Sequence, residues 1–214
     1  MISKIKLAIT VITTFIYSGF VSEAYISNAI AASETKSIEK SAKEQISVIY
    51  PQFIQIVKDG ADESKMMTFA KKNMDTVAIS KRFCGTNNEK LIKSIIKFLL
   101  WRLKTEAIQS VRGYTLSPDM KSVAKKKIVE VKCKLNNASS EDVNMTVIFS
   151  KNGSTLGKIR EIKILEIPLI EGAKTPMKKY FESNGIKIEA IKDAGKRAQK
   201  CCEALEDFIR SHKK

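Results

Sequence analysis

The segment "KIVEVKCKL", residues 127–135, is where the hydrophobic pattern of the chain changes from a helical period to a strand period. Its apolar and charged residues alternate: Val129, Val131, Cys133 and Leu135 against Glu130, Lys132 and Lys134. Strict alternation over this length is typical of a half-buried β-strand. The segment therefore predicts a sheet that is buried on one face only.

A second segment with the same alternation follows. "VNMTVIFS", residues 143–150, places every second residue on an apolar face: Val143, Met145, Val147 and Phe149. "SKNGS", residues 150–154, then supplies a hairpin turn, with Gly153 in the position that needs a permissive backbone. We therefore expect consecutive antiparallel strands joined by short turns.

The next strand is predicted over "GKIREIKILEIPLI", residues 157–170, with Pro168 near its end. The apolar residues change parity between Ile159 and Ile162, which indicates a bulge or a bend. "GYTLSP", residues 113–118, is expected to add a fourth strand at an edge of the sheet.

Helical periodicity dominates on both sides of these strands. Helices are predicted over residues 33–59, 64–72, 74–85, 88–111, 176–183 and 186–212. Pro51 can bend or break the first helix, Asn73 or Asp75 can cap the third, and Gly85 ends the third. This order predicts an α+β fold with a helical N-terminal half, a curved antiparallel sheet of about four strands and C-terminal helices.

One helix, "LIKSIIKFLLWRL" at residues 91–103, is apolar around most of its girth. One stripe has helical spacing: Ile92, Ile95, Ile96, Leu99 and Leu103. Further apolar residues lie outside that stripe. Thirteen residues make about 20 Å of helix, which is too short to cross a roughly 30 Å hydrocarbon layer. The helix must therefore be covered by protein or by a bound apolar ligand.

Residues 1–31 have the pattern of a signal peptide. A short basic start with Lys4 and Lys6 precedes an apolar stretch, and Ala29-Ile30-Ala31 fits the small-x-small cleavage pattern. We expect cleavage before Ala32, export to the periplasm, and one domain over residues 32–214. The alternative is an uncleaved anchor helix. No cysteine precedes Cys84, which argues against a lipidated leader.

The formal net charge of +15 at pH 7 favours an anionic partner. Lysine predominates over arginine and only 7% of the residues are aromatic, which is a poor composition for reading nucleic-acid bases. For an exported protein an anionic membrane surface is the more plausible partner. The alternative is that the lysines simply keep the surface soluble.

The catalytic inventory is small. His212 is the only histidine, and there is no glycine-rich phosphate loop, which argues against triads and His-ligated metals. Cys84 is expected at a helix C-terminus, where the dipole opposes a thiolate. We expect a binding protein rather than an enzyme, without a cofactor. The sequence has four cysteines: Cys84, Cys133, Cys201 and Cys202. They are either buried thiols or form up to two disulfides, and the sequence does not decide between these alternatives.

The order and spacing of four segments resemble the MlaC-like (toluene-tolerance) periplasmic phospholipid-binding proteins, which are auxiliary components of an ABC-type lipid transporter. The segments are "MDTVAISKRFCG", "LIKSIIKFLLWRLKTEAIQSVRGY", "GKIREIKILEIPLI" and "MKKYFESNGIKIEAI". Glu161 keeps an acid where the family has aspartate. Gly157 replaces a usual tryptophan, and residues 165–168 replace the typical E-G-[IV]-S.

The resemblance implies a shuttle that holds glycerophospholipid tails between sheet and helices. Such a carrier maintains outer-membrane lipid asymmetry by exchange with an inner-membrane ABC transporter and an outer-membrane lipoprotein complex. The residues expected to contact lipid are Ile79, Phe83, Ile92, Ile95, Ile96, Leu99, Leu103, Val129, Val131, Val147, Phe149, Ile162 and Ile164. The alternatives are a secreted basic interaction protein with a solid core and a membrane-anchored adaptor.

Overall fold

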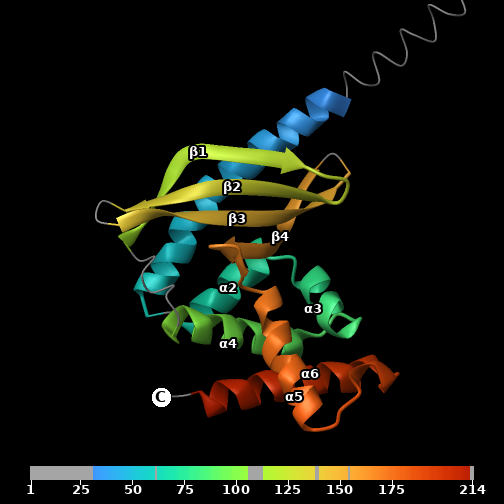
Figure 1. Cartoon of the computed structure of the whole chain (residues 1–214). Coiled ribbons are helices and arrows are strands. Elements are labelled where there is room, and N and C mark those ends of the chain that lie inside the picture. The colour runs from blue at the N-terminus through green and yellow to red at the C-terminus, as the bar shows by residue number, and fades with distance from the viewer. Residues whose placement is uncertain (1–30, 61, 106–112, 138–139, 154, 213–214) are drawn as a thin grey trace, which may run out of the picture.

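The computed structural model describes residues 31–60, 62–105, 113–137, 140–153 and 155–212 (Figure 1). Residues 1–30 of the predicted leader and residues 106–111 of the predicted long helix lie outside the described residues. None of the helices in the described ranges is both long enough and apolar enough to cross a membrane.

The elements follow the predicted order. A helix over residues 31–58 is followed by α2 (Glu63–Asn73), α3 (Thr76–Cys84) and α4 (Glu89–Thr105). The strands are β1 (Thr115–Ala124), β2 (Ile128–Asn137), β3 (Ser140–Asn152), β4 (Thr155–Ile164) and β5 (Ile167–Pro168). Two 3₁₀ turns and two helices follow: η2 (Glu171–Ala173), α5 (Lys174–Ser183), η3 (Ile188–Ala190) and α6 (Ala194–Ser211).

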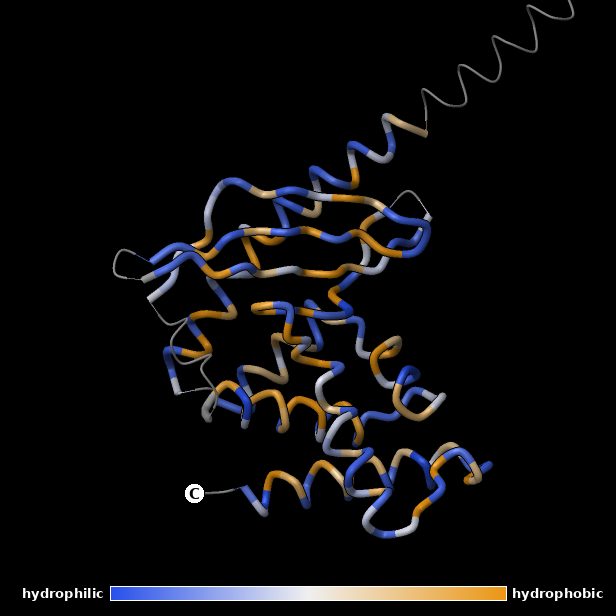
Figure 2. The backbone as a smooth tube through the Cα atoms, in the orientation of Figure 1, coloured by the Kyte–Doolittle hydropathy of each residue, from blue (hydrophilic) through white to orange (hydrophobic). Residues whose placement is uncertain are grey.

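The strands form one antiparallel sheet in sequence order, β1-β2-β3-β4-β5. The α+β architecture is therefore as predicted, with a fifth strand of two residues added at the edge. Figure 2 shows apolar residues recurring along the strands and along α4. The inner face of the sheet is buried. The opposite, outer face is exposed at Lys121, Val123, Lys132, Lys134 and Asn144, and buried at Thr146, Ser150 and Glu161.

The helix over residues 31–58 passes behind the sheet in Figure 1 and continues through Pro51 without a break. Tyr50 Oη donates to the Tyr114 carbonyl at 3.1 Å, and Glu39 Oε1 accepts from the Ala124 amide at 2.8 Å. Burial raises the pKa of Tyr50 to about 12. These contacts fix the helix against the β1 side of the sheet.

The predicted irregularity in β4 is a bulge. Ile148 pairs with Glu161 while Phe149 pairs with Ile159, so Arg160 is the extra residue between them. The bulge keeps both Ile159 and Ile162 on the buried face, which is the parity change seen in the sequence.

The predicted strand over residues 157–170 is wrong in its second half. The chain turns back at Leu165 and Glu166, which both have positive φ, 52° and 61°. Ile167 then pairs with Ile164, so β4 and β5 form a hairpin with a two-residue turn. The left-handed conformation at both turn residues matches the twist of the flanking strands, even though neither residue favours it.

The predicted helix over residues 186–212 is also wrong at its start. The chain forms η3 first, and α6 begins only after Asp193, whose carboxylate accepts from the Lys196 amide at 2.6 Å. Asp193 is one of the preferred N-cap residues, and the cap fixes the helix start. Helix α6 packs against α4 and α5.

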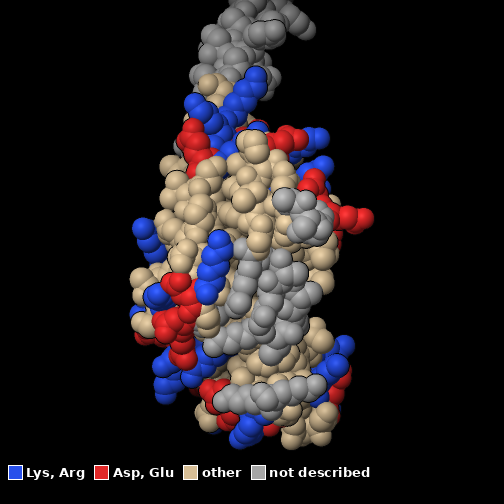
Figure 3. Space-filling model, turned by 90° about the vertical axis from the view of Figure 1, so that its left-hand side faces the viewer, with Lys and Arg blue, Asp and Glu red and all other residues tan. Residues whose placement is uncertain are grey.

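Surface charge is not uniform around this fold. On the face in Figure 3, basic and acidic side chains lie close together along the left side, beside uncharged residues.

The β4–β5 turn gives a stability prediction. Asn at position 165 tolerates the left-handed conformation and Gly at position 166 has no Cβ, so L165N/E166G should raise the free energy of unfolding by about 1–2 kcal/mol. Urea unfolding measures this. The control L165N/E166A removes the same side chains but keeps a Cβ at position 166. Equal stability of the two variants would contradict the assignment of strain.

Candidate functional site

The thirteen predicted lipid-contacting residues belong to one apolar assembly. Twelve are buried in a single hydrophobic core, with relative exposures of 7% or less, and Phe83 packs against that core while remaining partly exposed. The strand residues among them all lie on the inner face of the sheet. The structure thus brings the predicted residues together, with Phe83 at the boundary between core and surface.

Helix α4 lies in the middle of this assembly. It packs against α2 and α3 on one side and against α6 on another. The apolar residues outside the predicted stripe supply the α6 contact: the ring centroids of Phe98 and Phe208 are 5.7 Å apart, and those of Trp101 and Phe208 are 4.9 Å apart. Sequence analysis did not identify α6 as the cover for these residues.

A cavity of about 570 Å³ opens next to Phe83, between α3, α5, η3 and α6. Its apolar walls are formed by Phe83, Met177, Phe181, Ile186, Ile188 and Cys201. Its polar walls are formed by Lys174, Thr175, Lys178, Glu182, Lys187 and Glu189. The volume lies within the roughly 300–1,000 Å³ range of small-molecule sites.

Two of the three lysines at this cavity lie close to glutamate side chains. Lys174 Nζ lies 2.7 Å from Glu171 Oε1 and 5.9 Å from the ring centroid of Phe83. The hydrogen bond from Lys174 holds the pKa of Glu171 below its usual value. Lys178 Nζ lies 3.7 Å from Glu182 Oε1. An apolar floor with cations above it is suited to an amphiphile with an anionic head.

One buried carboxylate fixes the walls of the cavity. Glu161 Oε1 accepts from the amides of Ile162 at 3.0 Å and Ile170 at 2.8 Å, and Oε2 accepts from the Glu171 amide at 2.8 Å. Arg82 of α3 pairs with Oε2 at 3.5 Å. Burial raises the pKa of Glu161, while these amides and Arg82 oppose the rise. The carboxylate therefore joins β4 to α3 and to the turn that leads into α5.

A second arginine supports the same turn. Arg102 of α4 is 8% exposed and donates through Nη1 to the Pro168 carbonyl at 3.0 Å. A Cβ at Gly172 would lie 2.4 Å from that nitrogen, so the absence of a side chain there is what admits the guanidinium. Neither contact was predicted, because both depend on the chain reversal after Ile164.

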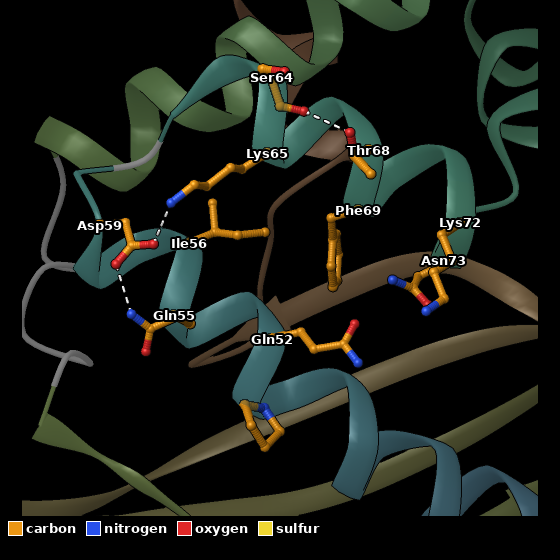
Figure 4. Close-up of a pocket in the computed structure, with 11 residues that line it drawn as sticks. Gln52, Gln55, Ile56, Asp59, Ser64, Lys65, Thr68, Phe69, Lys72 and Asn73 are labelled. Carbon is orange, nitrogen blue, oxygen red and sulfur yellow. Dashed lines mark hydrogen bonds and ion pairs between the residues drawn. The ribbon is translucent and has the colours of Figure 1, made fainter.

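A second groove on the described surface is lined mostly by polar residues. This groove of about 640 Å³ lies between the first helix and α2, and Figure 4 shows Phe69 standing between polar residues of both helices. Lys65 Nζ and Gln55 Nε2 contact Asp59 there, at 2.6 and 2.7 Å. This network lies at one end of the groove, and its polar groups bond to one another.

The cysteines are free thiols, and three of them lie near α6 or on it. Cys84 and Cys201 are buried, and Cys202 is partly exposed. Arg197 of α6 donates to the Cys84 carbonyl at 3.2 Å, which fixes the end of α3 against α6. Burial raises the pKa of the Cys201 thiol to about 12, so this thiol is protonated at neutral pH.

No known protein-family model matches this sequence, and no curated protein matches it either. Within the described residues, no group of three or more His, Cys, Asp or Glu side chains is arranged to hold a metal ion.

The Glu161 network gives the second prediction. Glu161→Ala leaves buried amides without their acceptor and Arg82 without its carboxylate partner, so it should lower the free energy of unfolding by about 3–5 kcal/mol. Glu161→Gln keeps one acceptor oxygen and should lose less. The control Glu44→Ala removes an exposed i,i+4 partner of Lys40 and should stay within about 0.5 kcal/mol of wild type. An Ala variant at 161 that matches this control would refute the role of Glu161.

Proposed function

We propose that this protein is an exported carrier of glycerophospholipid that moves lipid between the inner and outer membranes through the periplasm. The observation that supports this proposal most directly is the cavity beside Phe83, with its apolar floor and its lysines. An acyl chain fits the floor, and the phosphate of a head group fits the lysine side. The motif order noted in the sequence supports the same conclusion.

The energetics require that the lipid tails be enclosed. Each methylene removed from water contributes about 0.8 kcal/mol, so some thirty methylenes of a two-chain lipid represent more than 20 kcal/mol. A cavity of about 570 Å³ encloses only part of such a molecule. The second chain must then enter the apolar layer between the sheet and α4, where the predicted contact residues lie.

The proposed carrier exchanges its cargo with an inner-membrane ABC transporter and with an outer-membrane lipoprotein complex. It needs no catalytic group and no cofactor, because lipid transfer breaks no covalent bond. The rim lysines favour lipids with anionic phosphate groups.

The third prediction tests for cargo. Native mass spectrometry of protein purified from a lipid-containing host should show bound phospholipid. Ile186→Trp, which fills the cavity, displaces at least two methylenes and should weaken lipid binding by about tenfold. The control Val48→Trp changes a 61% exposed residue on the first helix and should retain the lipid. Wild-type protein without any phospholipid would refute the carrier function.

The fourth prediction tests whether lipid reaches the interior. Leu99 is 2% exposed at the middle of the α4 stripe. If the acyl chains lie against it, Leu99→Trp should fold with only a modest loss of stability after delipidation and should hold much less phospholipid. Unfolding of this variant, combined with a lipid-free wild type, would instead indicate a solid core and an interaction protein.

A further inference from the structure

The outer face of the sheet carries an uninterrupted row of residues across four strands. Lys121 of β1 pairs with Lys132 of β2, Lys132 pairs with Thr146 of β3, and Thr146 pairs with Lys163 of β4. We call Lys121, Lys132 and Lys163 the lysine row. At roughly 4.8 Å per strand, the row spans about 14 Å.

The row is electrostatically unfavourable for the isolated protein. Lys121 and Lys132 are directly opposite each other, and like charges in that position destabilise a sheet. Within the described residues neither of them forms an ion pair, whereas Lys163 lies 3.9 Å from Glu166 and also helps to lower the pKa of Glu171 by its charge. Thr146 between the lysines is 7% exposed.

Along β2 the surroundings of the row do not neutralise it. Lys134, one step along β2, is exposed and faces Asn144. Glu130, one step the other way, is paired with Lys125 at 2.7 Å. The row is therefore a cationic strip, in contrast to the mixed charges in Figure 3.

Exposed apolar side chains lie beside both ends of the row. Val123, two residues after Lys121 on the same face, is 54% exposed. Leu165, two residues after Lys163 in the β4–β5 turn, is 58% exposed. A soluble polyanion gains nothing from contact with apolar side chains, and the row has no aromatic ring for stacking nucleic-acid bases. Cations flanked by apolar residues instead match a lipid bilayer with anionic head groups.

We propose that the outer face of the sheet, through the lysine row with Val123 and Leu165, is the surface by which this protein docks on anionic membranes. The inference rests on the proposed function, because a carrier must approach the membranes that it serves. It places the docking surface on the opposite side of the sheet from the buried apolar layer, so docking and cargo binding use different residues.

Sedimentation with vesicles tests the proposal, using phosphatidylglycerol mixed with phosphatidylcholine and, in parallel, phosphatidylcholine alone. The wild type should bind only the anionic vesicles. Each lysine at an anionic surface contributes about fivefold in affinity, so K121Q/K132Q/K163Q should bind about a hundredfold more weakly. The control K36Q/K58Q/K192Q removes the same charge from exposed lysines outside the sheet and should lose only a few fold.

The two triple variants separate a local surface from net charge. Equal losses in both variants, or equal wild-type binding to neutral vesicles, would overturn the proposal. At high salt, screening weakens the attraction between the lysines and the vesicles, so V123S/L165S should reduce the vesicle binding that remains. If that binding is unchanged, Val123 and Leu165 are not part of the docking surface. Tighter binding of the wild type to single-stranded RNA than to anionic vesicles would also overturn it.

The cargo is measured on the same samples by native mass spectrometry. The lysine-row variant should keep the wild-type lipid content while losing vesicle binding. If the wild type contains no lipid but the row variant still loses vesicle binding, the carrier function fails and the docking surface stands. If lipid is present and the row variant binds vesicles normally, the docking surface fails alone.

Discussion

The Glu161 carboxylate joins three segments that are far apart in the sequence: β4, α3 and the turn that begins α5. A buried carboxylate is tolerated only when its oxygens are satisfied, and here backbone amides and Arg82 supply the donors. The position of α5 against α3 follows from this contact. The cavity beside Phe83 has α3 and α5 as walls, so its shape depends on a group that does not line it.

The layers of the molecule follow from the same junction. Helix α4 packs against α2 and α3 on one side and against α6 on another, and Arg102 connects it to the turn that Glu161 holds. The most apolar helix thereby becomes the centre of the molecule. The apolar residues around α4 are needed, in the first place, for packing against protein. A bound lipid would share this apolar layer with the protein that already packs against the other sides of α4.

Much of this arrangement could be predicted from local patterns. The parity change in β4 marks a bulge, Gly85 ends α3 with φ of 80°, and strand alternation identifies the buried face. The turn at Leu165 was missed because neither Leu nor Glu carries a turn signal, and its conformation is imposed by pairing. The cavity and the lysine row were missed because they depend on tertiary contacts and on strand register, which no local window contains.

The position of α6 against α4 has a consequence for the order of assembly during synthesis. The two helices are separated in the sequence by the whole sheet and by α5, so α4 is made long before the element that covers its Phe98 and Trp101 side. Until then, this flank stays exposed and attractive to chaperones. The fold therefore closes only after the C-terminal helix has been made.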